Sequence, residues 1–152
     1  LGQRFSIIAI SRRIQAWYRE CVQANGLIDR LASIRSLDGP LQDIGRVQDD
    51  HTERLKQLCL SAIHDDGADV IIIAGAPLAG LARSIKDQIP VPVVDGVSSA
   101  VCHAQTLVSL APVAHRQGSF APPPIKPNQG LPEGITRLLS GATRGASTGK
   151  KP

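Results

Sequence analysis

The stretch DVIIIAGAPLAGLA, residues 69–82, joins an apolar run to a loop of very small residues, Ala74-Gly75-Ala76-Pro77. Apolar residues then return at helical spacing, so the pattern predicts a strand, a tight loop and a helix. Small residues let backbone N–H groups approach a carboxylate or enolate oxygen, and a helix start adds a positive dipole end. A tight strand-to-helix turn without a ligand explains the same spacing. No side chain between Ala74 and Ala82 can hold or move a proton.

Two further polar positions follow predicted strands. Ser11 comes after the apolar run at residues 4–10, and Asp95-Gly96 come after PVPVV at residues 90–94. Ligands of open parallel sheets bind at the carboxyl ends of the strands, where these residues would meet. Ser11 and Asp95 could instead cap the helices that follow them. The sequence therefore predicts one set of substrate-binding residues: Ser11, Gly75, Ala76, Pro77, Asp95 and Gly96.

Three cysteines are the remaining candidates for chemistry. Cys21, Cys59 and Cys102 are scattered without CxxC spacing, which predicts free thiols, no metal site and a reducing compartment. Cys102 would lie about one turn into a helix whose start faces the ligand edge, where thiol pKa values can fall. It falls off the apolar stripe of that helix, so we expect it to face solvent and to take no catalytic part. His64, Asp65 and Asp66 would form a solvated turn at the opposite end of the sheet.

The elements that would position these residues alternate along the chain. Strands are expected at residues 4–10, 31–37, 69–74 and 90–94, and helices at 11–26, 49–64, 78–88 and 97–110. This βαβαβαβα order predicts an α/β fold with a four-stranded parallel sheet flanked by helices, half of a doubly wound architecture. The last helix carries an apolar stripe expected to face the core: Val97, Ala100, Val101, Ala104, Leu107 and Val108.

The charge of the chain is divided unevenly. Residues 1–111 carry 11 Lys and Arg against 12 Asp and Glu, a net charge of −1, whereas residues 112–152 carry 6 against 1, a net charge of +5. We therefore expect a folded domain at 1–111 and a basic, Pro/Gly-rich tail at 112–152 with a short helix at 131–139. With four aromatic residues in the whole chain, nucleic-acid binding is not expected. No run is apolar enough for a membrane span, which favours a cytoplasmic protein.

The stretches DDGADVIIIAGAPLAGLARSIKDQIPVPVVDGVSSAVCHAQTLV and LGQRFSIIAIS resemble the second half of the aspartate/glutamate/hydantoin racemase superfamily, most closely its hydantoin and allantoin racemase branch. The resemblance covers residues 1–111. It implies two similar α/β domains with the active site between them, and cofactor-independent proton transfer at the carbon alpha to a carbonyl. Two cysteines, one per domain, would act on opposite faces of a planar carbanion.

The chain departs from that pattern at the second thiol. The resemblance places it at Gly75, or at Ala76 if the register shifts by one residue, so the catalytic residues of this chain are unassigned. The resemblance implies an isomerase acting on a small carboxylate or a cyclic ureide such as a hydantoin. Leu1 and the lack of any Met favour a preceding first domain, without which we expect no turnover, and a homo-oligomer is possible. The alternatives are a non-catalytic carboxylate-binding domain, a single-thiol relative similar to decarboxylases, or an inactive truncated product.

Overall fold

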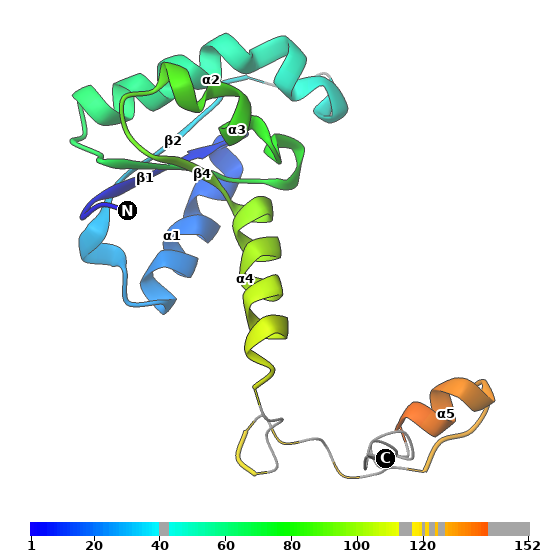
Figure 1. Ribbon diagram of the computed structural model, residues 1–152. Helices are drawn as coiled ribbons and strands as arrows, with labels where there is room; N and C mark the ends of the chain where they lie inside the picture. Colours follow the sequence, from blue (N-terminus) through cyan, green and yellow to red (C-terminus); the bar gives the residue numbers. More distant parts are fainter. Residues whose placement is uncertain (40–42, 113–116, 120, 122–123, 125–126, 140–152) are drawn as a thin grey trace, which may run out of the picture. The chain divides into compact units, whose positions relative to one another are not determined.

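The computed structural model describes residues 1–39, 43–112, 117–119, 121, 124 and 127–139. The chain divides into two compact units, Leu1–Ala111 and Pro112–Pro152. The first unit holds all the strands of the described residues and four of their five α-helices (Figure 1). In the second unit the described residues form one helix, α5 (Glu133–Leu139). No helix among the described residues is long and apolar enough to cross a membrane.

The first unit is built on a four-stranded parallel sheet in the order β2-β1-β3-β4. This arrangement confirms the predicted α/β class. The strands are β1 (Phe5–Ala9), β2 (Leu31–Ser36), β3 (Val70–Ile73) and β4 (Val93–Asp95). The last strand was expected at residues 90–94 but begins only after Pro92. Proline has no N–H for the ladder, and here Pro92 contributes its carbonyl instead, accepting from the amide of Ile71 at 2.9 Å.

Helices cover the two faces of the sheet unequally. α2 (Val47–His64) and α3 (Leu81–Ile85) lie on one face, and α1 (Gln15–Ala24) lies on the other (Figure 1). The larger core cluster lies under α2 and α3 and includes Leu55, Ile71 and Leu81. The smaller cluster lies under α1 and includes Phe5 and Val22, with no residue from β4. The α1 side of β4 is therefore left without a core.

The segment after β3 is not the continuous helix expected at residues 78–88. It forms a 3₁₀ turn at Ala76–Leu78, then a turn through Gly80 at φ 83°, then α3 and a second 3₁₀ turn at Lys86–Gln88. The side-chain amide of Gln48 donates to the carbonyl oxygens of Pro77 at 2.9 Å and Ala79 at 3.1 Å. A side chain from α2 thus satisfies carbonyls that a continuous helix would use itself. The dipole of a long helix at this loop, expected from the sequence, is absent.

The last helix of the unit also differs from expectation. α4 runs over Gly96–Leu110, and none of its residues is buried. The apolar stripe expected to face the core is exposed, with Val101 at 52% and Val108 at 79% of full exposure. The helical period correctly identified the apolar side of α4, but nothing among the described residues covers it.

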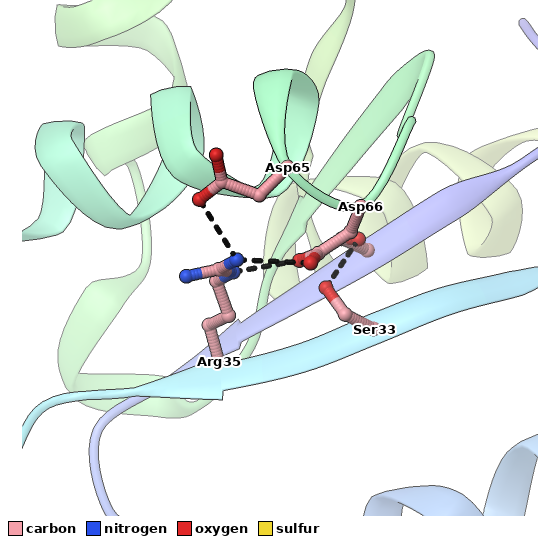
Figure 2. Close-up of polar contacts among 5 residues, drawn as sticks. Ser33, Arg35, Asp65 and Asp66 are labelled. Carbon is pink, nitrogen blue, oxygen red and sulfur yellow. Dashed lines mark hydrogen bonds and ion pairs between the residues drawn. The ribbon is translucent and has the colours of Figure 1, made fainter.

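Arg35 on β2 forms ion pairs with two carboxylates in the turn between α2 and β3 (Figure 2). Its Nε donates to Asp66 Oδ2 at 2.6 Å, and its Nη2 donates to Asp66 Oδ1 at 2.9 Å and to Asp65 Oδ2 at 3.2 Å. The Ser33 hydroxyl, beside Asp66, shares a hydrogen bond of 2.8 Å with the Ser6 hydroxyl on β1. Asp66 is therefore not the solvated turn residue expected from the sequence. The Arg35 guanidinium, followed by the Ser33 hydroxyl, lowers the pKa of Asp66 against the opposing effect of burial.

This pair predicts a loss of stability in acid. A carboxyl whose folded pKa is lowered stabilises the fold above its unfolded pKa, near 3.8, and that contribution disappears as pH falls through the folded pKa. We expect Asp66→Asn to reduce the free energy of unfolding at pH 7 by about 1–2 kcal/mol, between the values for exposed and buried ion pairs. In urea titrations, the variant should then lose less stability than the wild type between pH 5 and pH 3.

Asp65→Asn is the matched control. Its carboxylate is 62% exposed and makes one contact with Arg35, so its substitution should cost less than about 0.5 kcal/mol. Equal costs for the two substitutions would show that the double hydrogen bond to Asp66 contributes nothing specific.

Candidate functional site

The strand register brings the predicted residues to one edge of the sheet. Ile8, Ile73 and Asp95 are aligned across β1, β3 and β4. Gly75 lies two residues beyond this line and Ser11 three residues beyond it. The carboxyl ends of three neighbouring strands therefore present Ser11, the loop at Gly75 and Asp95 side by side, as expected for a ligand site in this architecture.

The loop at Gly75 has a backbone that glycine is suited to adopt. Its φ of 114° lies in the region that L side chains rarely enter. The carbonyl of Gly75 accepts from the amide of Leu78 at 3.0 Å, and the amide of Ala74 donates to Ile8 at 2.9 Å. Among the described residues, the amides of Gly75 and Ala76 donate to no protein acceptor. Two adjacent backbone donors are thus free for a ligand oxygen.

Asp95 and Ser11 both serve as caps. Asp95 is 4% exposed, and its Oδ1 accepts from the amide of Ser98 at 2.7 Å at the start of α4. Ser11 Oγ accepts from the amide of Arg13 at 3.2 Å. Capping occupies one oxygen of Asp95 and leaves the Ser11 hydroxyl hydrogen free to donate. These hydrogen bonds fix both side chains at the edge of the sheet, where a ligand could still reach them.

The predicted residues do not line one common hollow. Ser11 lies in a hollow of about 570 Å³ with Arg12, Arg13 and Asp38, at the ends of β1 and β2. Asp95 lies in another of about 370 Å³, which is also lined by Arg83, Lys86 and Cys102. Gly75, Ala76, Pro77 and Gly96 line neither hollow.

Four cationic side chains near this edge are not among the predicted site residues, although Arg12 lies in a segment expected at this edge. Arg12 pairs with Asp38 at 3.3 Å and lies beside Arg13, while Arg83 and Lys86 line the same hollow as Asp95. The position of Arg12 and Arg13 directly after the first strand was a usable signal. Arg83 and Lys86 could not be placed, because their position depends on how the segment after β3 breaks.

The three cysteines occupy different environments. Cys59 is fully buried in the larger core, where desolvation raises its thiol pKa to about 12. Cys21 is half-buried, and Cys102 is exposed as expected, yet it lines the hollow that contains Asp95. No group of three His, Cys, Asp or Glu side chains within the described residues could hold a metal ion.

An open parallel sheet with a small-residue loop at its carboxyl edge is the architecture of α/β domains that bind ligands at that edge. The family model for Asp/Glu/Hydantoin racemase matches residues 1–104, and the chain belongs to that family. This finding agrees with the resemblance drawn from the sequence.

Curated relatives and solved structures point to one branch. The chain is 35% identical over 127 residues to the hydantoin racemase of Paenarthrobacter aurescens, covering 80% of this chain and 52% of that protein. It is 29% identical over 137 residues to the hydantoin racemase of Pseudomonas sp. (strain NS671), covering 90% of this chain and 55% of that one. The allantoin racemase of Klebsiella pneumoniae is similar with a TM-score of 0.74 and 28% identity, over 84% of this chain and 52% of that chain. The chain thus spans about half the length of these relatives.

The cysteine environments predict very different reactivities. With a pKa of about 12 instead of 9.0, Cys59 would have about a thousandfold less thiolate than an ordinary thiol at pH 8, and it is also sealed from solvent. Cys102 should therefore react first with a disulfide reagent under native conditions, Cys21 more slowly, and Cys59 only on unfolding. Labelling followed by peptide mass spectrometry measures the order.

Cys102→Ser is the control for this assignment. The variant should lose the fastest phase and keep the slowest one unchanged. Native labelling of Cys59 at the rate of an exposed thiol would contradict the burial of α2 against the sheet.

Proposed function

We propose that this chain provides the substrate-binding side of a cofactor-independent racemase that acts on a hydantoin or a related small carbonyl compound. The observation that supports this most directly is the loop at Gly75 at the carboxyl edge of a racemase-family sheet, where two amides have no acceptor among the described residues. The curated relatives, of which this chain matches about half the length, are named hydantoin racemases. In the proposed reaction a proton leaves and returns at the carbon alpha to a carbonyl, and the loop amides stabilise charge on the carbonyl oxygen.

The proton carriers do not come from this loop. No side chain from Ala74 to Ala82 is ionisable, since the segment consists of Ala, Gly, Pro and Leu. Inversion requires groups on both faces of a planar carbanion. The relatives are about twice as long as the region that this chain matches. We propose that the proton carrier on the opposite face of the carbanion comes from a domain equivalent to their unmatched half. The uncovered apolar side of α4 is consistent with such a neighbour.

The free thiols are consistent with a cytoplasmic location.

The loop amides give a direct test of substrate binding. In ¹⁵N-labelled protein, a 5-substituted hydantoin should shift the amide signals of Gly75 and Ala76 most strongly. Ala79 is the internal control, because its amide already donates to Ala76 at 3.1 Å. Cyclopentanol, a five-membered ring without a carbonyl, should leave all three signals unchanged.

A parallel chiral assay should find no racemisation by this chain alone. Saturable shifts confined to α4 or α5 would place the ligand elsewhere and contradict the proposed role of the loop. Turnover by the chain alone would show that its proton carriers lie among residues 1–152.

Restoring a thiol tests the register of the loop. Gly75→Cys should raise the rate of deuterium exchange at C5 of a hydantoin in heavy water at least about tenfold over the wild type, because one thiolate on one face suffices for exchange. Gly75→Ser and Gly75→Ala are matched controls, because each carries the same strain at φ 114° without a thiol. All three variants should lose about 1–3 kcal/mol of folding free energy.

Proton NMR of the substrate measures the exchange, and urea titration measures stability. A Gly75→Cys variant that folds and binds the hydantoin, yet exchanges no faster than Gly75→Ser, would contradict the register.

A further inference from the structure

The hydroxyl of Tyr18 lies close to the loop at Gly75. Tyr18 lies in the first half of α1, and it packs against the smaller core cluster, which contains Phe5 and Ala74. The neighbouring indole of Trp17 has its ring centroid 5.3 Å away, tilted by 49°. Tyr18 is also the single tyrosine of the chain. The apolar packing holds the ring in place and carries the hydroxyl toward the end of β3.

The hydroxyl faces the side of Gly75 that has no side chain. A Cβ atom placed on Gly75 would lie 3.8 Å from Tyr18 Oη, an ordinary contact distance. A longer side chain at this position would reach the space in front of the phenol. Glycine therefore leaves the Tyr18 hydroxyl and the loop backbone facing each other without an intervening group.

The hydroxyl is free to donate. Among the described residues it makes no hydrogen bond, although the residue is half-buried. Burial raises the pKa of Tyr18, with a smaller contribution from Cys21. The phenol is consequently neutral at physiological pH and keeps its hydrogen.

We infer that the Tyr18 hydroxyl, together with the amides of Gly75 and Ala76, binds a carbonyl or carboxylate oxygen of the substrate. This inference rests on the proposed function and assigns a side chain to its binding site. The phenol donates a hydrogen bond to the oxygen on which negative charge develops when the alpha proton leaves, and its O–H bond stays intact. The loop, which has no polar side chain of its own, thus acquires one from α1.

Tyr18→Phe tests the inference, since it keeps the ring in the core and removes only the hydroxyl. Calorimetric titration with a 5-substituted hydantoin should show binding about tenfold weaker, equivalent to about 1.4 kcal/mol, within the range for a hydrogen bond between neutral groups. The melting temperature should be unchanged. Ser109→Ala is the control, because that exposed hydroxyl donates only within its own helix, to the Gln105 carbonyl.

The single tyrosine supplies a second measurement. With ¹³C-labelled tyrosine, hydantoin binding should shift the one phenol signal of the wild type, and cyclopentanol should not. Equal affinity of the wild type and Tyr18→Phe would overturn the role of Tyr18 while leaving the proposed function intact. Failure of the wild type to bind either a hydantoin or a small carboxylate would contradict both.

Discussion

A parallel sheet has two apolar faces, and each must be covered for the sheet to be stable in water. In this chain one face carries the larger core cluster. Ile8, Ile71 and Ile73 pack beneath α2 and α3 in the larger cluster. On the other face, α1 packs on the smaller core cluster. That cluster has residues from β1, β2 and β3 but none from β4. α1, the helix that covers this face, also carries Tyr18, whose hydroxyl lies near Gly75.

The loop after β3 shows how backbone geometry and acid–base chemistry compete for one position. A φ of 114° at Gly75 favours glycine and opposes the cysteine that the resemblance places there. Glycine in turn leaves room in front of the Tyr18 hydroxyl and keeps the amides of Gly75 and Ala76 accessible. The same residue that removes a proton carrier from the loop therefore suits the proposed binding of a substrate oxygen.

Local sequence patterns predicted the elements well and their long-range contacts poorly. Apolar runs and cap residues located β1, β2 and β3 and the caps at Ser11 and Asp95. The break after β3 was missed because Gln48, 29 residues away from Pro77, satisfies its carbonyl. The pairing of Arg35 with Asp66, 31 residues apart, was missed for the same reason. The approach of Tyr18 to Gly75 likewise depends on how α1 packs on the sheet, which no spacing within either segment encodes.

The stripe on α4 marks the limit of periodicity as evidence. A helical repeat of apolar residues shows which side of a helix avoids water, but it does not show what covers that side. Here Val101 and Val108 are exposed, and the chain matches about half of its relatives' length. The proposed site is likewise one-sided. Hydrogen-bond donors for a substrate oxygen can all come from one edge of one sheet, whereas proton transfer at both faces of a carbon needs groups on opposite sides. The binding side of the chemistry is therefore the part that a single domain of this family can carry.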